Sequence, residues 1–181
     1  MATACDYNCT ELPEHEKVQC GAHRKGGISA IGVLECNHTI TDFTSASQAY
    51  ANILAGKLTI IAGIKGEFAA ASPIEGENPE ACGATTILDG FDYVFNFKDF
   101  HVTSSNDSFY EALNKRSSYV VFFYCQDDEI RVVERKVVWS ILPPISPESN
   151  KEKQMYTGTI KWSSDVDEFP TLYTAPDAIY E

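Results

Sequence analysis

The segment Phe91-Asp92-Tyr93-Val94-Phe95-Asn96-Phe97-Lys98 decides the fold of this chain. Side chains of a β-strand point alternately to its two faces, so the four aromatic residues of this segment share one face. The residues between them, three of which are polar, occupy the other face. Four aromatic side chains on one side need a covering layer, because burying apolar surface is favourable and leaving it in water is not. The segment therefore predicts a strand in a packed sheet.

A short helix is predicted downstream of this strand. Ser108 and Glu111 match a capping box, in which the hydroxyl and the carboxylate each satisfy a free backbone N–H of the first turn. Phe109 and Leu113 lie four residues apart and would form the buried stripe of the helix. These signals predict a helix over about 108–116.

Further strands are predicted on both sides of this region. Residues 119–125 are apolar enough for a fully buried strand, with residues 130–141 as its hairpin partner across the acidic turn 126–129. Alternation from Tyr156 to Trp162 predicts a half-exposed strand. The other elements that we expect are a strand at 28–35, a helix at 45–54 with Ser45 as its cap, a strand at 57–65, and long connections at 66–90, where a short strand could form, and at 142–154.

These elements predict a mainly β (α+β) fold, an antiparallel β-sandwich or half-barrel with one or two short flanking helices. The strands follow one another through hairpins and loops and do not alternate with long helices. We divide the chain into an N-terminal Cys-rich arm (1–25), a single β-rich domain (26–162) and an acidic C-terminal arm (163–181). The last of these also carries apolar residues, which predict docking on a neighbour.

The charge excludes some classes of function. The 181 residues include 26 acidic and 14 basic side chains, a formal net charge of −12. Binding of nucleic acid requires Lys and Arg to displace counterions, so this excess argues against a simple nucleic-acid-binding protein. The longest apolar stretch is much shorter than the roughly 20 residues that span a bilayer, and no signal peptide is recognisable. We expect synthesis in a cytosol, where the six cysteines stay reduced.

Motifs of enzymes are absent from the sequence. There is no Gly-x-Ser-x-Gly elbow, no phosphate-binding Gly-x-x-x-x-Gly-Lys and no dinucleotide fingerprint. His15-Glu16 resembles the start of a zincin helix, but position 19 is Gln where the second histidine ligand would stand. His101, at the end of a predicted strand, reads better as a half-buried, hydrogen-bonded residue than as a base, because no partners accompany it. We expect a non-enzymatic protein and assign no catalytic, cofactor-binding or metal-ligating residue.

Three features leave weaker alternatives open. The spacing of the N-terminal Cys and His residues approaches that of a zinc site, but matches no established finger or ribbon; the residues are Cys5, Cys9, His15, Cys20 and His23. The acids at 127–129 suit a hairpin turn better than a cation site. The aromatic residues of 156–162 could form a sugar platform, although aromatics on one strand face more often belong to a core.

The chain resembles tail tube-like or tail ring structural proteins of Bacteroidetes-infecting tailed phages, including the crAss-like group. The likeness lies in the Cys-containing lead-in before Gly26-Gly27-Ile28, the strand at 156–162, and Phe169-Pro170 and Ala175-Pro176 near the end. The series of elements over 91–141 is also similar to the tail-tube fold.

The resemblance implies a virion protein, made in the host bacterial cytoplasm, that self-associates into hexameric or dodecameric rings. Neighbouring sheets would join edge to edge, and the rings would contact adjacent tail or portal-proximal ring proteins. DNA would pass through an acidic lumen without specific binding. Loop 142–154, or failing that 66–90, would make the contacts between rings. The alternative is a β-sandwich binding module: a carbohydrate-binding, fibre or capsid decoration protein.

Overall fold

The computed structural model describes residues 28–35, 38–77, 86–115, 119–125, 129–144, 154–165 and 171–174. Within these ranges the chain forms nine strands and two helices. Their bounds are β1 Ile28–Leu34, α1 Ala46–Leu54, β2 Leu58–Phe68, β3 Ser72–Glu77, β4 Thr86–Asp99, α2 Ser104–Asn114, β5 Val120–Cys125, β6 Glu129–Val133, β7 Val138–Leu142, β8 Tyr156–Asp165 and β9 Thr171–Thr174. No helix in these ranges has the length and apolar character needed to cross a membrane.

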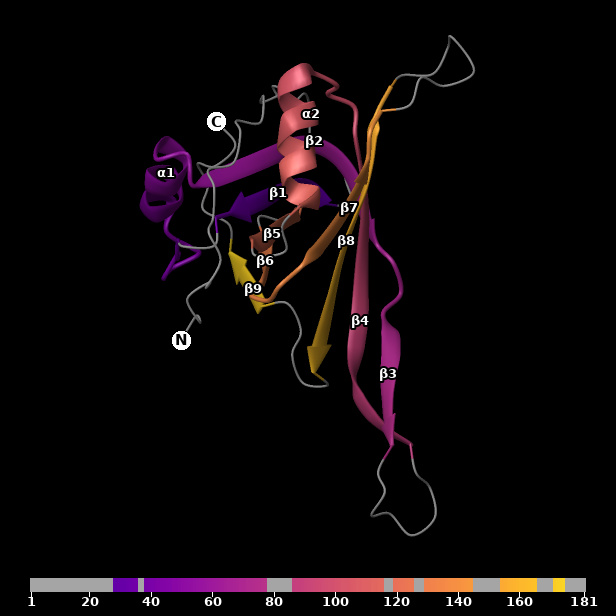
Figure 1. Cartoon of the computed structure of the whole chain (residues 1–181). Helices are drawn as coiled ribbons and strands as arrows, with labels where there is room; N and C mark the ends of the chain where they lie inside the picture. Colours follow the sequence, from indigo (N-terminus) through magenta and orange to yellow (C-terminus); the bar gives the residue numbers. More distant parts are fainter. Residues whose placement is uncertain are drawn as a thin grey trace.

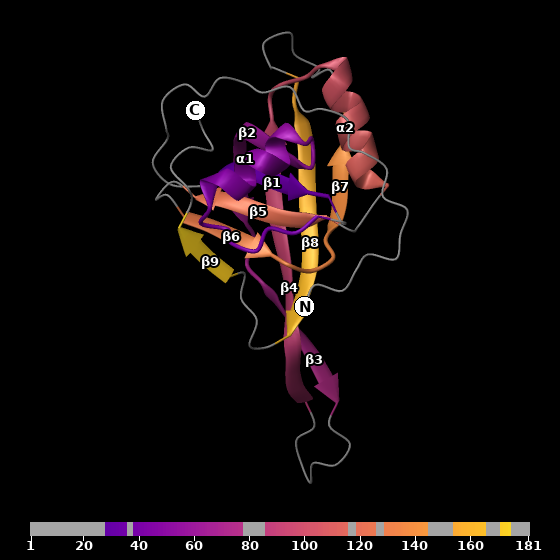
Figure 2. The same ribbon diagram turned by 90° about the vertical axis from the view of Figure 1, so that its left-hand side faces the viewer.

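All nine strands belong to one antiparallel sheet (Figures 1 and 2). Its order is β7-β8-β4-β2-β1-β5-β6-β9, and β3 pairs with β4 beside the end of β2. The sheet is open, with β7 at one end and β9 at the other. The predicted fold class is confirmed: a mainly β, antiparallel architecture with two short helices.

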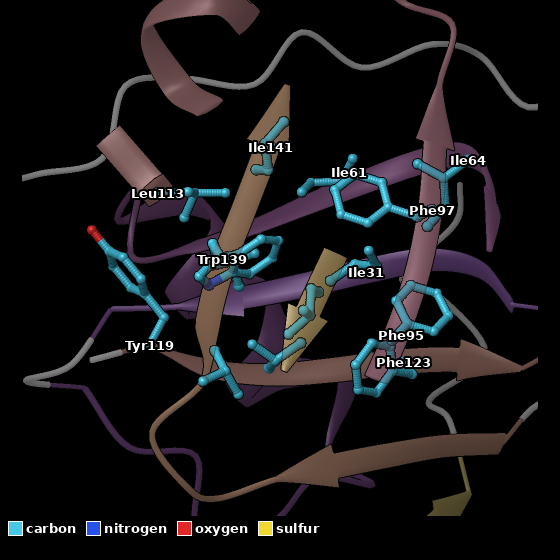
Figure 3. Close-up of a cluster of buried hydrophobic side chains, with 14 of the residues drawn as sticks. Ile31, Ile61, Ile64, Phe95, Phe97, Leu113, Tyr119, Phe123, Trp139 and Ile141 are labelled. Carbon is cyan, nitrogen blue, oxygen red and sulfur yellow. The ribbon is translucent and has the colours of Figure 1, made fainter. Parts of the chain in front are cut away.

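The sheet is strongly curled. Between β4 and β5 lie two other strands, so Phe95 and Phe123 would stand about 14 Å apart in a flat sheet. Their ring centroids are 4.7 Å apart, and Trp162 of β8 lies 5.7 Å from Phe123. Curling therefore brings the two halves of the sheet face to face, as in a half-barrel, around the core shown in Figure 3.

Two clusters of buried residues pack on the two faces of the sheet. On the inner face α2 contributes Phe109 and Leu113, both fully buried as the sequence pattern predicted. Phe95 and Phe97 belong to the same cluster, which confirms the aromatic face of their strand. On the outer face α1 covers the second cluster, which it enters through Ala49. Ser45 caps α1 by accepting a hydrogen bond from the Gln48 backbone N–H, again as predicted.

The predicted capping box of the second helix is wrong. The helix begins four residues earlier, and Thr103 is its N-cap, with Oγ1 accepting from the backbone N–H of Asn106 at 3.2 Å. Ser108 lies inside the helix and donates to the carbonyl of Ser104. The prediction was wrong because Thr103 also has a side-chain hydroxyl and stands just after β4, where the backbone is still extended, as an N-cap requires.

The single strand predicted over 130–141 is also wrong, because this segment forms two strands with different partners. β6 pairs with β5 as the predicted hairpin, whereas β7 pairs with β8. Residues 134–137 between them change direction, and Arg135 is tied to Asp165 by an ion pair of 3.0 Å. The turn residues 126–128 and loop residues 145–153 lie outside the described ranges.

The connection predicted at 66–90 is largely strand. β2 continues to Phe68, β3 follows after three residues, and β4 begins at Thr86, ahead of the expected strand. β3 pairs with β4 from Ser72 opposite Asp92 to Glu77 opposite Thr86, so the two strands form a long hairpin. Residues 78–85 lie outside the described ranges. Pro73 lacks a backbone N–H and cannot donate a hydrogen bond to a neighbouring strand. It is tolerated in β3 because β3 is an edge strand.

The last described residues belong to the same sheet. β8 runs to Asp165, past the boundary expected at 162, and β9 pairs with β6. Tyr173 of β9 packs against Phe43, with ring centroids 4.9 Å apart. Part of the predicted acidic C-terminal arm therefore packs on its own domain.

Candidate functional site

The side chains that the sequence analysis considered for catalysis or sugar binding do not lie together in one site. His101 is half-buried just after β4; its backbone N–H donates to Asp99 Oδ1 at 2.8 Å and its carbonyl accepts from Asn106 Nδ2 at 2.8 Å. Tyr156 and Trp162 are buried in the core, so they do not form an exposed sugar platform.

The candidate metal ligands cannot be placed. Residues 1–27, which contain the Cys and His cluster, lie outside the described ranges, as do Asp127 and Asp128. In the part of the chain that is described, no three His, Cys, Asp or Glu side chains are grouped closely enough to hold a metal ion.

A buried polar cluster joins the start of α2 to the sheet. Tyr110 Oη donates to Asp99 Oδ2 at 2.6 Å, and Asp99 is only 2% exposed. The single hydroxyl proton of Tyr156 is shared between two acceptors, Asp107 Oδ1 at 2.7 Å and the carbonyl of Thr103 at 3.1 Å. Burial raises the pKa of both phenols, and the neighbouring carboxylates raise the pKa values further, so both remain donors at neutral pH. The cluster fastens α2 onto β4 and β8.

The hairpin formed by β3 and β4 projects from the body of the molecule (Figure 1). β8 accompanies β4 from Asp99 only to Gly90, and β2 accompanies it only to Phe95. Within the described residues, β3 is the sole strand beside the end of β4 from Thr86 to Asp89. Leu88 is 43% exposed there, with Glu75 opposite it on β3.

Three exposed lysines share the outer face of the β2–β4–β8 region, which we call the lysine face. Lys65 of β2 lies directly opposite Lys98 of β4, and Lys98 lies opposite Thr157 of β8. Lys161 is four residues from Thr157 on the same strand and therefore points to the same face. None of the three lysines forms an ion pair within the described residues, although Lys65 Nζ lies 5.5 Å from the ring centroid of Phe100.

Two exposed aliphatic side chains extend the lysine face at the end of the sheet. Val138 and Leu142 of β7 are 57% and 56% exposed, and they lie opposite Lys161 and Thr157 respectively. Trp139 and Ile141, which alternate with them, are buried. The lysine face thus combines positive charge with apolar surface.

The free edge of β7 is partly covered by α2. Asn114 Nδ2 donates to the carbonyl of Ile141 at 2.9 Å, and Asn114 Oδ1 accepts from the Ile141 N–H at 2.8 Å. The side-chain amide of Asn114 thereby occupies the two backbone groups that a further strand would use. Pairing of another strand along β7 would have to displace this contact.

The sequence alone did not single out the lysine face. Lys98 and Lys161 were visible as polar-face residues of their strands, but nothing local shows that β2, β4 and β8 are neighbours. For the hairpin a signal existed: residues 72–90 contain four acids, Glu75, Glu77, Glu80 and Asp89, and no basic residue.

Comparison with known proteins adds no family to this description. No protein-family model matches the chain, and no curated protein matches its sequence.

Proposed function

We propose that this chain is a non-enzymatic virion structural protein that assembles with further copies into rings of a phage tail or tail tube, a conduit for genome ejection. The observation that carries the proposal is the β3–β4 hairpin. A two-stranded hairpin is marginally stable in water without further packing, so a projecting one favours a partner surface. The exposed side chain of Leu88 on this hairpin also favours contact with a partner surface.

We propose that the β3–β4 hairpin makes the contacts between rings. It leaves the body along β4, whose 14 residues span about 46 Å in an extended strand. Loop 142–154, the preferred segment in the sequence analysis, is described only at its ends. In a ring or stack of head-to-tail subunits, one end of each subunit contacts a different part of the next. A hairpin that projects from one end of the subunit suits such a contact.

Contacts around a ring would involve the curled sheet. Edge-to-edge joining, which the resemblance implies, is hindered at β7 because Asn114 already bonds to Ile141. The opposite end of the sheet is β9, a strand of four residues. We therefore propose that the subunits meet mainly through side chains of the sheet face and hairpin.

The charge supports the role of a conduit. A net charge of −12 repels phosphate, so a lumen lined by acids would let DNA pass without holding it. The alternative of a carbohydrate-binding module has less support, because Tyr156 and Trp162 are buried.

Assembly and location test the proposal together. Light scattering and negative-stain imaging of the purified chain over a range of concentrations should reveal closed rings, and cryo-imaging of intact particles should place the chain in the tail. A chain that stays monomeric at millimolar concentration and is missing from the particle would refute the proposal.

A further inference from the structure

We propose that the acidic hairpin of one copy docks on the lysine face of the next copy. This inference rests on the proposed function, because it names the partner surfaces of the assembling subunits. The lysine face carries three exposed lysines that form no ion pair within the described residues, the hairpin segment carries acids and no base, and each surface also has exposed apolar side chains.

The lysines of the lysine face form no ion pair with another described residue. Lys65 and Lys98 stand directly opposite each other, and like charges at such cross-strand positions are unfavourable unless an anion lies between them. Glu67, Asp92 and Asp165 occupy the same face. Asp92 accepts a hydrogen bond of 2.6 Å from Ser163, Asp165 pairs with Arg135, and none of the three acids pairs with a lysine of this face. In a chain with 26 acids and 14 bases, three unpaired lysines on one face favour an acidic partner.

The hairpin has the matching chemistry. Glu75 and Asp89 are exposed, no base occurs anywhere in residues 72–90, and Leu88 is exposed among the acids. The apolar side chains complement each other as well, since Leu88 can pack on Val138 and Leu142 while the acids approach Lys98 and Lys161. Burial of these aliphatic groups would supply affinity, and the charges would set orientation.

The contact that we propose joins two copies, because the hairpin cannot reach the lysine face of its own chain. Thr86 and Lys98 are twelve residues apart on one extended strand, a separation of about 40 Å. The first residues of β4, where the hairpin projects, thus lie far from Lys98. A contact between two different surfaces of the same chain is heterologous, so its repetition produces a closed ring or an open stack.

Complementary charge reversal tests this contact. One variant carries Glu75→Lys and Asp89→Lys, and the other carries Lys98→Glu and Lys161→Glu; all four positions are exposed. In each variant alone the reversed positions meet side chains of their own sign on the next copy, although Glu77, Glu80 and Lys65 are unchanged, so self-association should be about tenfold weaker. In an equimolar mixture every hairpin again finds a face of opposite charge, and assembly should return. Sedimentation velocity and light scattering measure the association, after circular dichroism shows that both variants fold.

The control is Lys115→Glu, which reverses an exposed charge on α2, away from the lysine face, and should leave self-association unchanged. Rings that persist in both double variants, or a mixture that associates no better than its components, would overturn the docking contact and leave ring assembly standing. A wild-type chain without any self-association at millimolar concentration would overturn the docking contact, whereas the proposed function is refuted only if the chain is also missing from the intact particle.

Discussion

Asp99 is the residue on which the junction of β4, β8 and α2 depends. Its two carboxylate oxygens accept hydrogen bonds from the Tyr110 hydroxyl and the His101 backbone N–H. A buried carboxylate is stable only when its oxygens are satisfied, so these donors hold the start of α2 in place. The pattern of apolar residues carried no sign of this junction, because it joins polar groups that lie on different elements.

Replacement of Tyr110 by Phe should destabilise the protein. The change removes a donor from the buried Asp99 while keeping the aromatic ring, and loss of such a bond costs about 1–3 kcal/mol. The free energy of unfolding from urea titration measures the effect. Tyr50→Phe, at an exposed site on α1, is the matched control. Equal stability of the two variants would contradict the assigned role of Asp99.

The buried phenols also predict alkaline sensitivity. Burial, assisted by Asp99 and Asp107, raises the pKa of Tyr110 and Tyr156 above the value of about 10 that holds in the unfolded chain. The folded chain therefore keeps protons that the unfolded chain releases. Stability from these groups is fully present below about pH 10 and falls as the pH rises beyond it, by up to about 1.4 kcal/mol per pH unit for each tyrosine.

Urea titrations at a series of alkaline pH values measure this decline. The double variant Tyr110→Phe/Tyr156→Phe lacks both titrating groups, so its unfolding free energy should fall less steeply with pH than that of the wild type. Parallel curves would mean that the two phenols do not contribute.

At the scale of elements, the start of α2 can be tested directly. Thr103→Ala removes the cap at the backbone N–H of Asn106 and should cost about 1 kcal/mol. Ser108→Ala should cost little or increase stability, because Ser108 is exposed within the helix and Ala has the higher helix propensity. Thermal and urea unfolding of the two variants would give the opposite order if the capping box at Ser108 were correct.

Elements with strong local patterns were predictable, whereas those defined by distant partners were not. The aromatic alternation of 91–98 identified the centre of β4, and Ser45 identified the start of α1. The segment between β6 and β7 contains no Gly or Pro, so its sequence does not indicate a break between two strands. It exists because β6 pairs with β5 and β7 with β8, strands on opposite halves of the curled sheet.

The hairpin was missed for a related reason. Pro73, Gly76 and Gly90 are typical of loops, so the sequence predicted a connection with at most a short strand, and the pairing of β3 with the first residues of β4 was missed. Gly90 is required by packing, since a Cβ there would lie 2.3 Å from the carbonyl oxygen of Ser164 on β8. Of the candidate surfaces, only the acidity of the hairpin was visible in the sequence; the lysine face depends on sheet order.

At the scale of the whole molecule, β9 forms one end of the open sheet. Tyr173→Ala should lower the free energy of unfolding by about 2 kcal/mol, because its ring packs on Phe43 and on the outer core cluster. Since these contacts lie within one chain, the loss should be independent of protein concentration, as measured by urea unfolding of dilute and concentrated samples. A loss found only in concentrated samples would instead assign Tyr173 to a contact between copies.

β4 gives the molecule a mechanical property. The same strand forms half of the projecting hairpin and the centre of the inner core, where β8 pairs with it from Gly90 to Asp99. Hydrogen bonds of an antiparallel pair run perpendicular to the strands. Tension applied to the hairpin along β4 therefore loads these bonds in shear, all together, and does not open them one after another. A subunit gripped by its hairpin would transmit force into its core before it yields.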